Sequence, residues 1–326
     1  MTRVLAAVVS LILLAVPIGS SSAEEGAGLQ LVLGVTSEGR ATDQWLAMLR
    51  KRLPDPEYSE LATSVKELSD EERKWAELIG AKAADWERRR DGLASPFAPI
   101  EPPAHVVIVM GNRGGQDAFT HDAATIGFDL SALYSVYGDA LLPDNTGRIN
   151  RFFDHEYTHL LQKGWLADHH PYDGSSPLRA ALLDIWLEGL GHHHSLSDRW
   201  RATGGMHSKA AREALTVLEP RFAARLAALA CASWETAGPL LEDLSQGRFE
   251  AKWGALPAAL WLEAEASGDR GALRRFVQAG PDGVWELAAR HLPDPLGKVV
   301  TEARRSAAVC SQTGDEGHAG RRVPGS

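Results

Sequence analysis

The stretch Arg151–Trp165, RFFDHEYTHLLQKGW, decides how the middle of this chain folds. Apolar side chains recur in and around it at three- and four-residue spacing, which is the pattern of a helix with one buried face. These side chains are Ile149, Phe152, Phe153, Leu160 and Leu161. The pattern predicts a helix that Asn145 or Thr146 caps at its start and that stops near Gly164.

Within this helix, residues 155–159 read His-Glu-Tyr-Thr-His, an H-E-x-x-H string. Side chains four residues apart lie one above the other on a helix, so His155 and His159 can face the same ion. Glu156 is rotated from that line, and its carboxylate can reach a water beside the ion. Hydrolytic zinc sites use three protein ligands and activate a water, whose proton a carboxylate accepts. The string therefore predicts a zinc site with Glu156 as general base and calls for a third ligand.

The next helix supplies a candidate for that ligand. Ser176 and Pro177 are a helix start signal, and apolar residues follow at helical spacing in LRAALLDIWLEGLG. Glu188 lies on this helix, with 28 residues between it and His159, which leaves room for a loop and an antiparallel return. Rival ligands are histidines in the loop and after Glu188: His169, His170, His192, His193 and His194.

H-E-x-x-H followed by a glutamate and glycine on the next helix resembles the gluzincin group of zinc metallopeptidases. The chain reads Trp186-Leu187-Glu188-Gly189-Leu190-Gly191, similar to the W-L-x-E-G-x-A of many members. More loosely, it looks like the predicted zinc-dependent proteases among exported bacterial proteins. The resemblance covers about residues 104–195. It implies His155, His159 and Glu188 as zinc ligands, Glu156 as general base, and a cleft lined by an edge strand just before the motif helix.

Two positions depart from the gluzincin pattern. Gly191 stands where alanine is usual, and His192 stands where thermolysin-like members have an aspartate that supports a zinc histidine. Asp184, one turn before Glu188, or Asp154 is an alternative support for a ligand. Candidate donors to the oxyanion of the reaction are His192, His194 and Tyr172.

Outside the motif, two apolar stretches have the patterns of β-strands. His105–Gly111 is a β-branched run that predicts a buried strand, and ATIGFDLSAL (124–133) predicts a second strand, at which Gly127 permits close approach of a substrate backbone. The expected fold is α+β and mainly helical, with a zincin-like core of a small mixed sheet on the motif helix. The expected divisions are a signal peptide (1–23), an N-terminal helical lobe (24–103), the metallopeptidase core (104–195), a C-terminal helical lobe (196–311) and a disordered tail (312–326).

The N-terminus has the parts of a secretory signal peptide: Arg3, an apolar stretch over 4–18, and small residues 21–23 before Glu24. A cleaved signal predicts a secreted or periplasmic protein. No other segment is apolar enough over a sufficient length to predict a membrane span. The formal net charge of −9, with no long basic run, argues against nucleic acid as a partner. The sequence leaves open whether the two cysteines, Cys231 and Cys310, form a disulfide.

These observations favour an exported zinc metallopeptidase that hydrolyses peptides or proteins. One alternative is a zinc hydrolase of a non-peptide amide or ester, and another is a non-catalytic helical binding protein. Serine, cysteine and phosphate-binding signatures are absent, since the chain has no G-x-S-x-G and GNRGGQD lacks the lysine of a P-loop.

Overall fold

The computed structural model describes residues 28–169 and 175–316. The predicted signal peptide therefore lies outside the described residues, as do His170, Tyr172 and the last ten residues of the chain. In the described part, no helix has the length and apolar character needed to cross a membrane.

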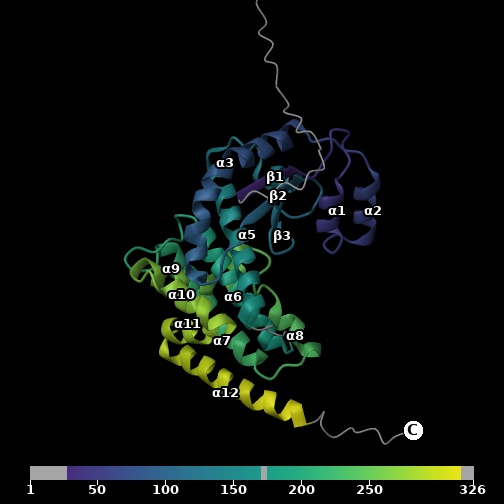
Figure 1. The fold of residues 1–326 in the computed structure, drawn as a ribbon. Coiled ribbons are helices and arrows are strands. Elements are labelled where there is room, and N and C mark those ends of the chain that lie inside the picture. Colours follow the sequence, from purple (N-terminus) through teal and green to yellow (C-terminus); the bar gives the residue numbers. More distant parts are fainter. Residues whose placement is uncertain (1–27, 170–174, 317–326) are drawn as a thin grey trace, which may run out of the picture.

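A four-stranded mixed sheet forms one end of the molecule (Figure 1). Its strands are β1 (Gly28–Leu33), β2 (His105–Gly111), β3 (Ala118–Thr120) and β4 (Thr125–Asp129), in the order β1-β2-β4-β3. β2 pairs in parallel with both β1 and β4, and β3 pairs with β4 in the antiparallel direction. The prediction of a mainly helical α+β fold with a small mixed sheet is confirmed.

Helices cover both faces of this sheet, which explains why β2 is β-branched and apolar along nearly its whole length. Helix α3 (Asp70–Ala94) packs on one face, where its Trp86 stacks between Phe128 of β4 and Phe153. Helices α1 (Asp43–Leu49) and α2 (Asp55–Thr63) cover the other face, with Trp45 buried against Phe119 (Figure 1). Buried aromatic side chains therefore pack against both faces of the sheet.

The motif helix is α5, and it is longer than the sequence pattern predicts. It runs from Pro143 to His169, so Asn145 lies inside its first turns and Gly164 inside its last. Asn145 donates instead to the carbonyls of Tyr137 and Asp139, which ties the start of the helix to the preceding turn. The predicted stop at Gly164 is wrong, because the buried Trp165 extends the apolar face beyond it.

Helix α6 (Pro177–Ser195) follows, and Ser176 caps it as predicted, accepting a hydrogen bond from the backbone N–H of Arg179. Contacts between the two helices run antiparallel: Gln162 meets the carbonyls of Trp186 and Leu187, whereas Thr158 meets His194. This arrangement brings the middle of α6 beside the H-E-x-x-H string.

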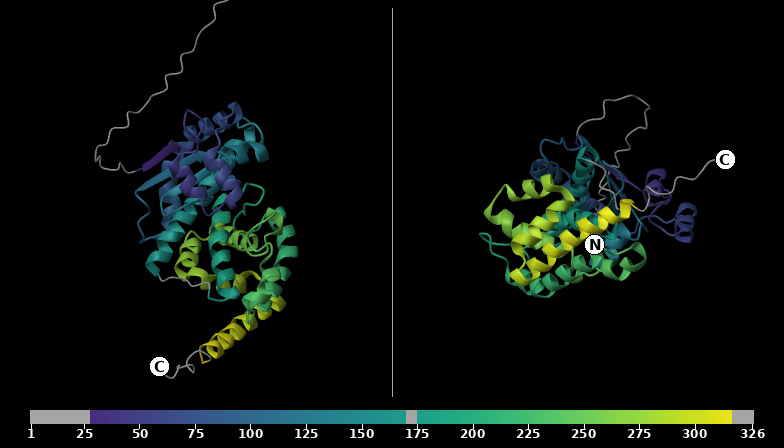
Figure 2. Two further views of the ribbon diagram at one scale, coloured as in Figure 1. Left: turned by 90° about the vertical axis from the view of Figure 1, so that its right-hand side faces the viewer. Right: turned by 90° about the horizontal axis from the view of Figure 1, so that it is seen from below.

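Helices α7 to α12 form a layer around α6 at the end opposite the sheet, whereas α4 packs against α3 and the sheet (Figures 1 and 2). In chain order the further elements are η1 (Ser95–Phe97), α4 (Leu130–Tyr137), α7 (Lys209–Leu229), α8 (Trp234–Leu241), η2 (Phe249–Ala251), α9 (Ala255–Gly268), α10 (Ala272–Ala279), η3 (Gly280–Asp282), α11 (Gly283–His291) and α12 (Asp294–Glu316). Helix α12 projects along the base and is joined to the end of α7 by a disulfide between Cys231 and Cys310 (Figure 2).

The expected divisions of the chain do not coincide with breaks in the structure. The boundary at 103/104 separates β1 from β2, which pair over six residues, and a single apolar cluster extends from Val35 to Ala303. The proline-rich segment expected as a linker contributes Phe97 to that cluster. Helix α12 also continues to Glu316, past the expected start of the tail at residue 312.

One ion-pair cluster in the helical layer makes stability depend on pH. Burial would raise the pKa of Glu265, but hydrogen bonds from His291 and Arg290 outweigh it and lower the pKa to about 2. A depressed carboxyl pKa contributes stability above the ordinary value of 4.5, and this contribution is lost as the pH falls towards 2.

We expect Glu265→Gln to lower the free energy of unfolding by about 1 kcal/mol at pH 7, and by less at pH 3.5. Urea unfolding at both pH values measures this. Glu302→Gln is the matched control, because Glu302 pairs with Arg305 at an exposed position, and its loss should change stability by less than about 0.5 kcal/mol. Equal losses in the two variants at pH 7 would contradict the assignment.

Candidate metal centre

Helices α5 and α6 bring His155, His159 and Glu188 together. The two Nε2 atoms lie 3.0 Å apart, and each is 3.5 Å from an oxygen of Glu188. The three side chains expose between 13% and 18% of their surface, so the cluster is largely shielded from water yet reachable from outside. Two imidazoles from successive turns of α5 and one carboxylate from α6 thus converge on one point.

The spacing of these atoms fits a tetrahedral metal ion. Two ligand atoms bound at about 2.0 to 2.1 Å from such an ion lie about 3.3 Å from each other. The observed separations of 3.0 and 3.5 Å bracket that value. Two imidazoles and one carboxylate are also the donor set that hydrolytic zinc sites use. The residues present could therefore hold a metal ion, and their donor set is one that suits zinc.

Gln162 fixes the orientation of one imidazole. Its amide NH2 donates to the carbonyls of Trp186 and Leu187, which leaves the amide oxygen facing Nδ1 of His159 at 2.9 Å. His159 must then carry its proton on Nδ1, so the lone pair of Nε2 points into the cluster. Sequence reasoning missed this residue, although its position one turn after His159 on the same helix was the available signal.

Gly191 permits the close approach of α6 to both histidines. A Cβ at this position would lie 2.9 Å from Cε1 of His155 and 3.2 Å from Cε1 of His159. Atoms at such distances must move apart, so an alanine would push the imidazoles away from Glu188 or separate the helices. The departure from the usual alanine therefore has a steric reason in this chain.

His192 also borders the cluster, one helix turn after Glu188. In the described residues, His155, Glu188 and His192 form a group whose candidate ligand atoms all lie within 4.8 Å of one another. Nε2 of His192, however, accepts a hydrogen bond of 2.9 Å from Nζ of Lys252, and it is 3.8 Å from Glu188. His192 is thus already paired, whereas Nε2 of His159 faces only the cluster. Lys252 was not predicted, because it lies 60 residues further along the chain.

The charges of the cluster shift the pKa of its members strongly. Burial would raise the pKa of Glu188, but the hydrogen bond from His155 and the charges of the neighbouring histidines bring it well below its ordinary value. Burial lowers the pKa of His159 to about 4, and the charge of His155 acts in the same direction. The imidazole of His159 is therefore neutral at pH 7, the form in which histidine binds a metal.

Glu156 lies beside the cluster on the side of the sheet. It is buried, and burial raises its pKa to about 7, with a smaller opposing effect from His155. The charges of Asp117 near β3 and of Arg52 after α1 also act on it. The carboxylate thus occupies a position adjacent to the cluster without being one of its converging atoms.

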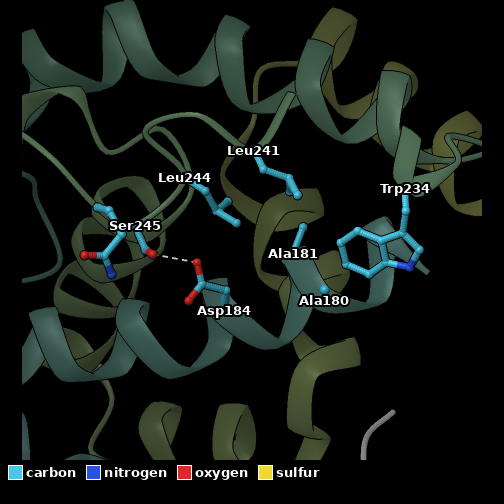
Figure 3. Close-up of a pocket in the computed structure, with 8 residues that line it drawn as sticks. Ala180, Ala181, Asp184, Trp234, Leu241, Leu244 and Ser245 are labelled. Atoms are coloured by element: carbon cyan, nitrogen blue, oxygen red, sulfur yellow. Dashed lines mark hydrogen bonds between the residues drawn. The ribbon is translucent and has the colours of Figure 1, made fainter. Parts of the chain in front are cut away.

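Other residues singled out from the sequence lie elsewhere. Asp154 pairs with Arg89 of α3. Asp184 accepts a hydrogen bond of 2.5 Å from the hydroxyl of Ser245 (Figure 3). The contacts of the two aspartates are thus with Arg89 and Ser245, and they differ from the predicted role of orienting a ligand.

The rival histidines are also engaged away from the cluster. Nδ1 of His194 bonds to the hydroxyl of Thr158 at 2.7 Å, which turns it from the oxyanion position considered for it. His193 faces Glu263, and Nδ1 of His169 bonds to the carbonyl of Trp165. Tyr172, the third oxyanion candidate, lies outside the described residues, as does His170.

The strand at the edge of the sheet is not the expected one. β4, which contains Gly127, lies between β2 and β3, so it is an inner strand. A Cβ at Gly127 would lie 2.7 Å from the ring of Phe119, so the glycine makes room for a side chain rather than a substrate. The edge strands are β1 and the short antiparallel β3, and β3 is the one that packs beside α5.

Comparison of the chain with known protein families, curated proteins and solved structures gives no match.

The role of Gln162 gives a test of the site. We expect Gln162→Met, which keeps the volume but removes the hydrogen bond to His159, to weaken zinc binding about 10- to 100-fold. Competition with a chelating dye measures the affinity. Thr158→Val is the control, because Thr158 is equally buried on α5 and its hydroxyl contacts His194 instead of the cluster. Unchanged affinity in Gln162→Met would show that the hydrogen bond does not organise the site.

Proposed function

We propose that this chain is an exported zinc metallopeptidase that hydrolyses peptide bonds in peptides or proteins. The observation that carries the proposal is the convergence of His155, His159 and Glu188 at the spacing of tetrahedral ligands, with Glu156 beside them. A buried set of two imidazoles and one carboxylate, on two helices with a spare carboxylate adjacent, has the composition that water activation requires.

We assign His159 rather than His192 as the third protein ligand with His155 and Glu188. Gln162 holds His159 in the tautomer whose Nε2 is free to bind, whereas Lys252 occupies Nε2 of His192. His192 then acts on Lys252, which it holds at the border of the cluster. This assignment matches the ligand set that the gluzincin resemblance implies.

Each of the neighbouring polar groups has a place in hydrolysis. Zinc at this cluster supplies a Lewis acid that makes water nucleophilic near neutral pH. Glu156 accepts the proton of the attacking water and passes it to the leaving amine. Lys252 replaces the oxyanion donors considered from the sequence, because its ammonium contacts Nε2 of His192 at the border of the cluster and carries protons that can stabilise a developing negative charge.

The edge strand supports a peptide as substrate. β3 pairs with β4 on one side only, and it lies beside the motif helix, where Lys163 of α5 donates to Thr120 at 2.8 Å. An extended peptide can add to such an edge through main-chain hydrogen bonds. This would lay its backbone across Glu156 and the cluster, a mode of binding that small amides and esters do not use.

The export of the protein is supported by two features. The N-terminal pattern is that of a signal peptide, and the disulfide between Cys231 and Cys310 is a bond that persists mainly outside the cytosol.

The test is hydrolysis of a mixed peptide library by zinc-loaded protein, with Glu156→Gln as the decisive variant. We expect the wild type to cleave, and Glu156→Gln to lose about 10²- to 10⁴-fold in kcat/KM while it still binds zinc. Glu263→Gln, which alters a buried carboxylate paired with Arg201, controls for general effects of the change. Full activity in Glu156→Gln, or no cleavage by zinc-loaded wild type, would refute the proposal.

A further inference from the structure

Two cations lie on opposite sides of the edge strand β3. Arg52, just after α1, has its guanidinium carbon 4.2 Å from the centre of the Phe119 ring and donates to Oε1 of Gln116 at 3.1 Å. Lys163 of α5 donates to the hydroxyl of Thr120 at 2.8 Å. Phe119 and Thr120 are consecutive in β3, so their side chains point to opposite faces of the sheet. A chain that pairs with the free edge of β3 therefore passes between the two charges.

The contacts of both cations are with uncharged groups, and neither forms an ion pair within residues 28–169 and 175–316. Gln116 engages only Nη1 of Arg52. Lys163 reaches Asp122 through the backbone carbonyl, at 3.2 Å, while the carboxylate of Asp122 accepts from the N–H of Ala124. Arg52 is exposed and Lys163 is half-buried, so an anion can reach both from outside. Two positive charges are thus held in place by neutral groups.

The pair also lies close to the candidate metal centre. Lys163 follows His159 by one helix turn, which is about 6 Å along the axis or about two residues of extended peptide. Burial lowers the pKa of Lys163, whereas the charge of Glu156 raises it and that of Arg52 lowers it. Arg52 is also among the charges that act on Glu156. The two cations and the carboxylate beside the cluster therefore share one region of the molecule.

A carboxylate is the anion that this pair suits. Its two oxygens accept the parallel N–H groups of a guanidinium, and an ammonium adds a further charge-assisted hydrogen bond. A peptide on the edge of β3 presents such a group where its main chain ends. An internal stretch of main chain presents neutral amides at the same place and leaves both charges without an anion.

We infer that Arg52 and Lys163 bind the terminal carboxylate of the substrate, so that the protein is a carboxypeptidase that releases one or two residues from the C-terminal end of a peptide. This rests on the proposed function, since the cluster is taken as the point at which the bond is cleaved. Each turnover adds one water across a peptide bond and releases a free amino acid or a dipeptide. The shortened peptide ends in a new carboxylate, which the same two cations can bind.

A neutral peptide, prepared as the free acid and as the C-terminal amide, tests the binding. Isothermal titration of zinc-loaded Glu156→Gln protein compares the two affinities without turnover. We expect the acid to bind at least about tenfold more tightly, the gain from charge-assisted hydrogen bonds to one carboxylate. A second amide that ends in glutamate should bind no more tightly than the neutral amide, because its acidic group is on a side chain.

The products of zinc-loaded wild type test the activity. Mass spectrometry should show loss of one or two C-terminal residues from the acid. Cleavage of the amide should be at least about tenfold slower in kcat/KM, because the amide gives the two cations no anion to bind.

Substitutions then locate the effect. Arg52→Gln and Lys163→Gln each remove one charge and should each reduce the preference for the acid several-fold, and Arg52→Lys should restore part of it. Arg50→Gln is the matched control. Arg50 ends α1 two residues earlier, where it lies over the ring of Tyr58 and 3.9 Å from Asp55, so the preference should remain unchanged.

The outcomes separate this inference from the proposed function. Equal affinity for acid and amide, an undiminished preference in both Arg52→Gln and Lys163→Gln, or an equal loss in Arg50→Gln overturns the carboxylate site. Tight binding of the glutamate amide also overturns it, because the cations then recognise an acidic side chain. Cleavage of internal peptide bonds in any of these cases leaves the proposed function standing. A preference for the acid that both variants reduce, without cleavage by zinc-loaded wild type, supports the carboxylate site and refutes the peptidase.

Discussion

The close approach of helix α6 to helix α5 at Gly191 is the constraint on which the candidate metal centre depends. The imidazoles of His155 and His159 rest against the backbone of α6 at this point, which brings them to 3.5 Å from Glu188. Gln162 then joins the same two helices by hydrogen bonds and fixes the tautomer of His159. The lack of a side chain at Gly191 and the hydrogen-bonded amide of Gln162 together define the geometry of the cluster.

The rest of the fold holds that pair of helices in place. On one side, Trp86 stacks on Phe153 and Phe128 and so joins α3, α5 and the sheet. On the other side, the nearly all-apolar helix α9 packs along α6, where Gly189 lies close to Ala258. Two layers therefore flank the pair of helices, and Lys252 at the border of the cluster comes from the less regular chain between α8 and α9.

The sequence predicted the parts of the fold that rest on local patterns. Apolar spacing identified α5 and α6, and Ser176 with Pro177 marked the start of α6 because a cap and a first-turn proline act within one turn. The ends of α5 were predicted wrongly. The helix begins at Pro143, because the side chain of Asn145 bonds to the preceding turn instead of capping, and the buried Trp165 extends its apolar face beyond Gly164. β3 was missed because a strand of three residues is too short to show an alternating apolar pattern. This led to the wrong choice of edge strand.

In the candidate site, too, local patterns predicted some residues, while others depend on tertiary contacts. Helical spacing predicted that His155 and His159 face the same point, whereas Glu188 was expected from the return helix and the gluzincin resemblance, with several histidines as rivals. Lys252 and Ser245 come from the chain that follows α8, and no local spacing relates them to the motif. Asp184 was noticed for its position one turn before Glu188, yet its contact with Ser245 depends on how that later segment folds.

Zinc stoichiometry, measured by elemental mass spectrometry on protein purified without a histidine tag, tests the central claim most directly. We expect about one zinc per chain in the wild type and well below one in Glu188→Ala. Asp184→Ala, which removes a carboxylate one turn away on the same helix, should retain the metal. Absence of zinc in the wild type after reconstitution, or full retention in Glu188→Ala, would contradict the account.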